Sequence, residues 1–230
     1  MIFFDIDETL IDQRRAEAAA AERFLELYGR ELDRPYSRAE FCALWRSLRE
    51  KHAPAFFAGT VSAHEQRRRR MRELFARAGR LLDDAEVDRR IELYESDYRH
   101  SWSLFDDVLP ALASLRGSRR GIISNGSVAQ QTRKLEQTGV ARCFELVLVS
   151  EEIGAAKPQR EIFLAACRRA RAEPERCVYV GDRLEQDARA SSAAGMRGVW
   201  LCRSEPRARG SDVIGSLTEL PSLLRERSAA

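Results

Sequence analysis

Two aspartates, Asp5 and Asp7, stand two residues apart near the start of the chain, and Thr9 follows them. They come directly after four apolar residues, a run that is typical of a strand buried on both faces of a parallel sheet. In such sheets ligands bind beyond the carboxyl ends of the strands. Carboxylates this close repel each other unless a divalent cation neutralises them or they divide the roles of nucleophile and acid. An acidic turn that caps a helix is the alternative, and this motif alone does not decide.

The next predicted strand, residues 121–124, ends in a serine, an asparagine and a glycine just ahead of a helix. The hydroxyl of Ser124 and the free backbone amides of Asn125 and Gly126 can hold an anion at the N-terminus of that helix. A serine that only caps the helix is very common, and it is the alternative interpretation.

Lys157 follows the strand predicted over residues 146–149 and precedes Pro158, which favours an extended backbone at the lysine. Most lone lysines lie at the surface. This chain, however, has only two others, Lys51 and Lys134, since arginine supplies almost all of its positive charge. The position of Lys157 at the carboxyl edge of the sheet therefore favours a function.

Two more carboxylates, Asp182 and Asp187, follow the strand predicted over residues 177–180. Each could be an ordinary residue at the start of the helix predicted over residues 184–194. Together they bring negative charge to the edge where Asp5 and Asp7 lie, and such a set suits a hard, oxygen-liganded cation such as Mg²⁺.

The elements that must position these residues are strands that alternate with helices of about a dozen residues, which predicts an α/β fold. We expect a Rossmann-like parallel sheet with helices on both faces, formed by residues 1–13 and 103–230. Residues 14–102 show four amphipathic helical patterns and no convincing strand, so they are expected to form an inserted four-helix cap domain. Within that domain, Phe56 and Phe57, after Pro54, break the helical pattern. They are expected to form a loop that faces the cleft and could stack on a base or sugar, with core packing as the alternative.

The composition argues against several classes of function. The 230 residues carry a net charge of only +3, which argues against a dedicated nucleic-acid binder. The run Arg67–Arg70 is expected to be a solvated helix face, with contact to an anionic substrate as the alternative. Five scattered cysteines predict reduced thiols, and no stretch reaches the ~18 apolar residues of a membrane span. We expect a cytoplasmic protein, a monomer or weak homodimer, without membrane partners.

The ordered set Asp5-x-Asp7-x-Thr9, Ser124-Asn125-Gly126, Lys157-Pro158 and Gly181-Asp182 with Asp187 resembles the haloacid dehalogenase-like hydrolase superfamily. More narrowly, it is similar to the phosphatases with a helical cap inserted after the first motif. The resemblance covers residues 1–13 and 103–224. Three positions depart from the family pattern: Glu8 stands where many members have Gly or Asn, Arg183 where a small polar residue is usual, and Gln186 where Asn is frequent.

The resemblance implies a role for each matching residue. Asp5 would be the nucleophile that forms an aspartyl-phosphate, Asp7 the general acid and base, and Thr9 a support for their loop. Phosphoryl oxygens would be bound by Ser124, Asn125, Gly126 and Lys157. Mg²⁺ would be held by Asp5, Asp182 and the backbone carbonyl of Asp7, with Asp187 near or in the outer shell.

The expected reaction is therefore Mg²⁺-dependent hydrolysis of a small phosphorylated metabolite, and by family analogy we expect a nucleoside monophosphate or a sugar phosphate. A 2-haloacid dehalogenase also uses an aspartate nucleophile but needs no acid two residues on. A phosphonatase would need a Schiff-base lysine, and Lys51 is the only lysine in the cap. A non-catalytic regulator that binds phosphorylated ligands is the alternative from a different class.

Overall fold

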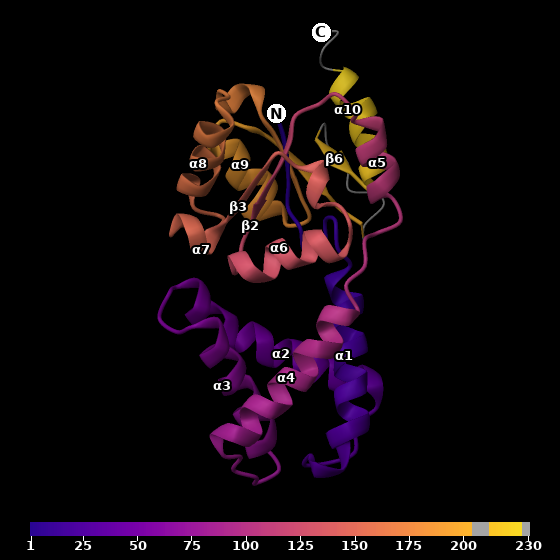
Figure 1. The fold of residues 1–230 in the computed structure, drawn as a ribbon, viewed down its shortest axis with the longest axis vertical. Helices are drawn as coiled ribbons and strands as arrows, with labels where there is room; N and C mark the ends of the chain where they lie inside the picture. Colours follow the sequence, from indigo (N-terminus) through magenta and orange to yellow (C-terminus); the bar gives the residue numbers. More distant parts are fainter. Residues whose placement is uncertain (204–211, 227–230) are drawn as a thin grey trace. The chain divides into compact units, whose positions relative to one another are not determined.

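The computed structural model describes residues 1–203 and 212–226. The chain divides into two compact units, which are described separately (Figure 1). The sheet unit consists of Met1–Asp12 and Ser103–Ala230, and the helical unit consists of Gln13–Trp102. No helix in the described part of the chain combines the length and the hydropathy that a membrane span needs.

The sheet unit contains a six-stranded sheet in the order β3-β2-β1-β4-β5-β6, in which all neighbouring strands are parallel. The predicted parallel α/β fold is confirmed. The first strand of the chain lies at the centre, so it is buried on both sides, as its unbroken apolar run predicts. The strands are β1 (Ile2–Phe4), β2 (Arg120–Ser124), β3 (Leu146–Val149), β4 (Val178–Gly181), β5 (Arg197–Leu201) and β6 (Val213–Ile214).

Helices cover both faces of this sheet (Figure 1). Alternation along β1 shows the division: Ile2 and Phe4 pack in one core with residues of α5, α6 and α10, whereas Phe3 packs in the other core with residues of α8 and α9. The helices are α5 (Val108–Ser114), α6 (Val128–Gln137), α7 (Ser150–Ile153), α8 (Arg160–Ala170), α9 (Ala190–Ala193) and α10 (Leu220–Glu226). Short 3₁₀ turns lie at Ala141–Cys143, Pro174–Arg176 and Leu217–Glu219.

The segment after β4 differs from the prediction. Instead of one α-helix over residues 184–194, the chain forms a π-helical turn, Leu184–Arg189, and then α9. The carboxylate of Asp187, inside this turn, accepts a hydrogen bond from the backbone N–H of Arg183 at 2.9 Å and one from Lys157 Nζ at 2.7 Å. Apolar periodicity cannot reveal a local widening of this kind, which is held by polar contacts and is frequent at functional sites.

The helical unit contains the four predicted helices, α1 (Gln13–Tyr28), α2 (Arg38–Phe57), α3 (Ala63–Ala76) and α4 (Asp84–His100), with a 3₁₀ turn at Gly29–Glu31. Ser37 starts α2 and forms a capping box with Glu40. The expected loop at Phe56 and Phe57 is wrong, because α2 continues to Phe57 and the carbonyl of Pro54 accepts from Ala58 N at 2.9 Å. Pro54 removes only its own donor, and the following amides keep their partners. Aromatic residues fill the core, among them Phe24, Phe41, Trp45, Phe75 and Tyr94.

Gly198 on β5 fixes how closely the strand approaches the segment that carries Asp187. A Cβ there would lie 2.0 Å from the carbonyl oxygen of Ala188 and 2.6 Å from Ser191 Oγ. We expect Gly198→Ala to lower the free energy of unfolding by roughly 1–3 kcal/mol or more, because a backbone carbonyl cannot move aside like a flexible side chain. Chemical denaturation measures this. In the matched control, Gly215→Ala, the added Cβ meets nothing closer than 3.4 Å, and an equal loss in both variants would contradict the prediction.

Candidate active site

The parallel register brings the functional loops to one edge of the sheet. Phe4 on β1 pairs with Ile122 on β2 and with Val180 on β4, so the chains leave these three strands at the same level. Asp5, the first residue after β1, donates its backbone N–H to the carbonyl of Val180 at 2.9 Å. Side chains that stand more than a hundred residues apart in the sequence are thus neighbours.

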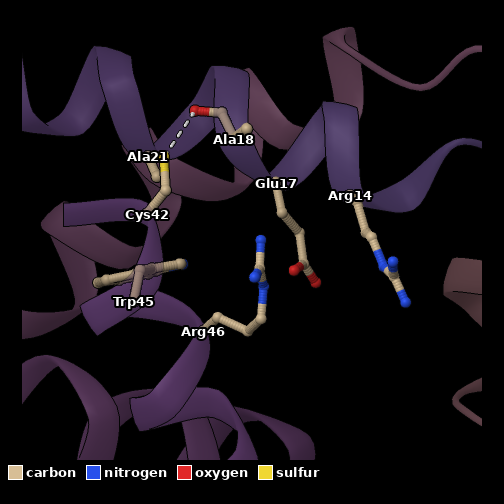
Figure 2. Close-up of a pocket in the computed structure, with 7 residues that line it drawn as sticks. All are labelled: Arg14, Glu17, Ala18, Ala21, Cys42, Trp45 and Arg46. Carbon is tan, nitrogen blue, oxygen red and sulfur yellow. Dashed lines mark hydrogen bonds between the residues drawn. The ribbon is translucent and has the colours of Figure 1, made fainter. Parts of the chain in front are cut away.

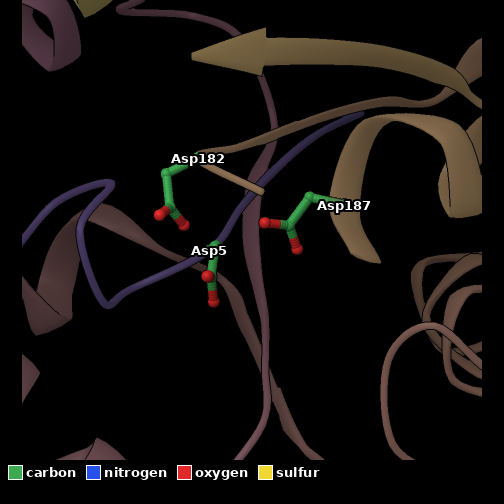
Figure 3. Close-up of side chains that lie close together, drawn as sticks. All are labelled: Asp5, Asp182 and Asp187. Atoms are coloured by element: carbon green, nitrogen blue, oxygen red, sulfur yellow. The ribbon is translucent and has the colours of Figure 1, made fainter. Parts of the chain in front are cut away.

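Asp5, Asp182 and Asp187 form a group of three carboxylates. One oxygen from each lies within 4.8 Å of the others, and Figure 3 shows the three side chains converging. Asp5 and Asp187 are buried, whereas Asp182 is half-buried. Within the described residues this is the only cluster of acidic, histidine or cysteine ligands that could hold a metal ion.

Lys157 inserts its ammonium group into this cluster. Its Nζ lies 2.9 Å from Asp5 Oδ1 and 2.7 Å from Asp187 Oδ1, and it donates to the hydroxyl of Tyr179 at 2.8 Å. Burial alone would lower the pKa of Lys157, but Asp187 and Asp5 outweigh it and raise that pKa. The lysine is therefore a fixed positive charge. The Tyr179 hydroxyl, which accepts from Lys157, donates its own hydrogen to the carbonyl of Ile123 at 2.9 Å and is thereby fixed in place.

The carboxylate group carries more negative charge than Lys157 balances. Burial, together with Asp187 and Asp7, raises the pKa of Asp5 from 3.8 to about 6 despite the attraction of Lys157. Burial and the charges of Asp5 and Asp187 raise the pKa of Asp182 to about 8. Carboxylates that resist ionisation because they crowd together in a partly buried site are suited to a hard divalent cation, so the donor set fits Mg²⁺.

The loop after β2 is tied to the lysine loop. The side-chain amide of Asn125 donates to the carbonyl of Lys157 at 3.0 Å, and its oxygen accepts from Lys157 N at 2.8 Å. The side chain of Asn125 therefore positions Lys157. Ser124, which is buried, accepts from Gln131 Nε2 at 3.0 Å, and Gly126 donates its N–H to Ser150 Oγ at 3.0 Å.

Asp7 stands apart from the other carboxylates and has its own partners on α6. Lys134, fully buried, forms an ion pair with one carboxylate oxygen of Asp7, and Gln131 Nε2 donates to the other at 3.2 Å. Gln131 thereby links Asp7 to Ser124. The Asp7 side chain keeps 27% of its surface exposed, so it can still reach a ligand.

The remaining predicted residues have more local surroundings. Thr9 is buried, and its hydroxyl has no hydrogen-bond partner within the described residues, although its carbonyl accepts from Arg203 at 2.8 Å. Glu8 adopts a left-handed φ of 60°, which explains why Gly or Asn is common at this position in the family that the motifs resemble. Arg183 is exposed and donates to Gln186 at 2.7 Å rather than entering the carboxylate group.

Sequence reasoning missed Gln131, Lys134 and Tyr179. A signal was available for one of them, because Lys134 is one of only three lysines in an arginine-rich chain. Gln131 and Lys134 are also three residues apart on a helix, which places them on one face. Nothing in its strand position distinguishes Tyr179 from an ordinary core aromatic residue.

The site can be compared with known proteins. The family described as haloacid dehalogenase-like hydrolase matches residues 1–195. A phosphoserine phosphatase of Thermus thermophilus is 33% identical over 77% of this chain and 72% of its own length. A ribulose-1,5-bisphosphate 5-phosphatase of Halopiger xanaduensis is 32% identical over 89% and 85%, respectively. A glyceraldehyde 3-phosphate phosphatase of Methanopyrus kandleri is 42% identical, but the match spans only 44% of each protein.

Two solved structures are similar along the whole chain. The hydrolase YfnB of Bacillus subtilis, solved with bound magnesium, has a TM-score of 0.77 at 23% identity, with 97% of each chain covered. A 2-haloacid dehalogenase of Pseudomonas syringae has a TM-score of 0.68 at 26% identity, with 98% of each chain covered. The fold is thus shared by enzymes of more than one chemistry, and the choice between them depends on the residues of the site.

The raised pKa values of Asp5 and Asp182, about 6 and about 8, predict that Mg²⁺ binds more tightly as the pH rises. Protons and the cation compete for the same oxygens. Because both folded-state pKa values lie above the ordinary 3.8, the cation-free protein loses stability as the pH rises from about 4 to about 8, and the cation offsets that loss. We expect Mg²⁺ to raise the melting temperature little near about pH 5 and most near about pH 8.

Thermal unfolding with and without Mg²⁺ at each pH measures this difference. Asp182→Asn removes one ligand charge and should abolish most of the Mg²⁺ effect at the higher pH. A Mg²⁺ shift of equal size at both pH values would contradict the competition between protons and the cation.

Proposed function

The chain belongs to the haloacid dehalogenase-like hydrolase family, and from that premise we propose that it is a Mg²⁺-dependent phosphatase of small phosphomonoesters. The observation that carries the proposal is that Asp5 and Asp7 have different neighbours. Asp5 lies against Lys157 and the other carboxylates, whereas Asp7 lies outside that group and contacts Lys134 and Gln131. Two carboxylates in different environments are suited to two different roles.

Asp5 is the nucleophile in this mechanism. Its carboxylate oxygen attacks phosphorus, the bond from phosphorus to the ester oxygen breaks, and an aspartyl-phosphate forms. Asp7 gives its proton to the departing alkoxide and is left as a carboxylate. A water molecule then attacks phosphorus while Asp7 takes its proton, and inorganic phosphate leaves with Asp5 regenerated.

The other residues bind and compensate charge. Lys157 Nζ, 2.9 Å from Asp5 Oδ1, neutralises the transferring phosphoryl group, and the Ser124 hydroxyl with the backbone amide of Asn125 binds its oxygens. The Gly126 amide, also expected there, donates instead to Ser150 Oγ and helps to hold the loop. Mg²⁺ would be held by Asp5, Asp182 and the backbone carbonyl of Asp7, with Asp187 beside them. When bound, it supplies the positive charge that lets an anionic phosphate approach an anionic carboxylate.

Small phosphorylated metabolites are the proposed substrates, with nucleoside monophosphates and sugar phosphates as the leading classes. Relatives named as phosphatases of phosphoserine and of ribulose-1,5-bisphosphate support a substrate of this size. The helical unit is proposed to be the cap that selects the leaving group, as inserted domains of this kind do by closing over a site. Thr9 is proposed to support the Asp5–Asp7 loop by packing, since it is fully buried.

Phosphate release tests this proposal directly. We expect the protein to release phosphate from p-nitrophenyl phosphate with Mg²⁺ and to stop when EDTA removes the metal. Asp5→Asn should lower kcat at least about a thousand-fold, because an amide cannot form the acyl phosphate. Near-unchanged melting temperature would show that the variant is folded.

Two results would overturn the assignment. Near-wild-type turnover by Asp5→Asn would refute the nucleophile. Halide release from 2-haloacids without phosphate release would identify the dehalogenase chemistry of the same fold, which has no need for an acid at Asp7.

Lys134 is expected to position the Asp7 side chain toward the leaving group. Lys134→Met keeps the length of the side chain but removes the ammonium group that holds Asp7 in place, so we expect kcat to fall roughly ten- to a hundred-fold. The loss should be larger for an alkyl phosphate than for p-nitrophenyl phosphate, because only the poorer leaving group depends strongly on proton donation. Lys51→Met is the matched control, since Lys51 is exposed and pairs with Glu73 in the helical unit. Equal losses on both substrates would mean a merely structural lysine.

A further inference from the structure

In the described part of the helical unit, the buried guanidinium of Arg70 has no carboxylate in direct contact. Only 7% of the surface of Arg70 is exposed. Within the described residues its guanidinium group makes no ion pair, and its Nε, which is fully enclosed, has no hydrogen-bond partner. Removing a charge from water without a partner is costly, so such groups normally have an anion beside them.

The other arginines of the run are paired, which makes Arg70 the exception. Arg68 contacts Asp88 at 2.7 Å, Arg69 contacts Glu65 at 3.1 Å, and Arg67 forms an ion pair with Glu95. The predicted solvated face therefore holds for exposed Arg69 but is wrong for Arg70, which is buried beside Met71.

The guanidinium of Arg70 lines a hollow of about 250 Å³, open side included. Its Cζ lies 4.7 Å from the centre of the Trp45 ring, so the aromatic face holds the group flat while its N–H edge stays available. The remaining walls are Tyr94, Ile91, Met71 and Arg67. We call this space the Arg70 hollow.

The nearby acidic groups already have other partners. Glu17 contacts Arg49 at 2.6 Å and accepts from Gln13 at 3.0 Å. Glu95, the partner of Arg67, also contacts Arg99 at 3.4 Å. Within the described residues no carboxylate forms an ion pair with Arg70. Burial lowers the pKa of Arg70, and the nearby Tyr94 and Glu17 offset this only in part.

Trp45 also lines a second hollow, between α1 and α2, where more arginines gather (Figure 2). In that view Arg46 points toward Glu17, and Arg14 projects from the next turn of α1. The surroundings of Trp45 thus carry more positive than negative side chains on both sides, which favours an anionic ligand.

We propose that the Arg70 hollow binds an oxyanion, a carboxylate or a phosphate group, which pairs with the guanidinium of Arg70. A planar guanidinium with an available edge suits such a group, because both oxygens of the anion can be contacted at once. The ligand is a small anion bound by the helical unit alone, so the inference does not rest on the proposed phosphatase function.

Arg70→Gln and the exposed neighbour Arg69→Gln form a matched pair for the test. Both variants remove one arginine from the same run, but of the two only Arg70 lines the hollow.

The test needs no catalysis. Inorganic sulfate is titrated into the Mg²⁺-free protein while tryptophan fluorescence is followed, and Trp45→Phe identifies the part of the signal that comes from Trp45. Sulfate should change the Trp45 signal in the wild type and in Arg69→Gln but not in Arg70→Gln.

That response supports the oxyanion site even if no phosphoester is hydrolysed. The inference is overturned if Arg70→Gln is folded and keeps the wild-type response to sulfate. Should Arg70→Gln fail to fold, the wild type decides, because a wild-type protein without a sulfate response from Trp45 would show that Arg70 only packs on Trp45.

Discussion

The buried ammonium of Lys157 is the interaction on which the sheet-edge site depends. It lies within 3 Å of two carboxylates that are themselves buried, and a charge in such a place persists only with partners in good geometry. One ammonium group cannot balance three carboxylates. Fully ionised, Asp5, Asp182 and Asp187 with Lys157 leave a charge of −2, which one divalent cation would cancel. The raised pKa values of Asp5 and Asp182 have the same cause, the excess of negative charge in this group.

Much of this arrangement could be predicted from the sequence because it depends on strand ends. An apolar run followed by polar residues marks the carboxyl end of a buried strand, and parallel strands deliver all such ends to one edge. Asp5, Ser124, Lys157 and Asp182 were accessible to that argument. Tyr179, Gln131 and Lys134 were not, because they reach the site from within a strand and from the inner face of α6. Which face of a helix meets a sheet loop is decided by packing, not by local pattern.

The errors of prediction have physical causes of the same kind. The π-helical turn at Leu184–Arg189 is held by bonds to the Asp187 carboxylate, and no periodicity announces it. The run of four arginines seemed uniformly polar. Successive helical residues, however, are rotated by about 100°, so four in a row span most of the circumference and one of them must face inward. Arg70 is that residue, next to Met71 and over Trp45.

Unbalanced buried charge therefore has opposite signs in the two units of the chain. The sheet unit gathers carboxylates around one lysine, and the helical unit buries the guanidinium of Arg70, which forms no ion pair with a carboxylate of the described residues. The side chains around each site do not balance its charge. The acidic groups near Arg70 already pair with other arginines, and Lys157 is shared between two carboxylates. Folding alone does not explain why a chain would retain such groups, since apolar residues of similar size would pack at lower cost. Ligands of complementary charge give both a reason: a cation at the sheet edge and an oxyanion at Trp45.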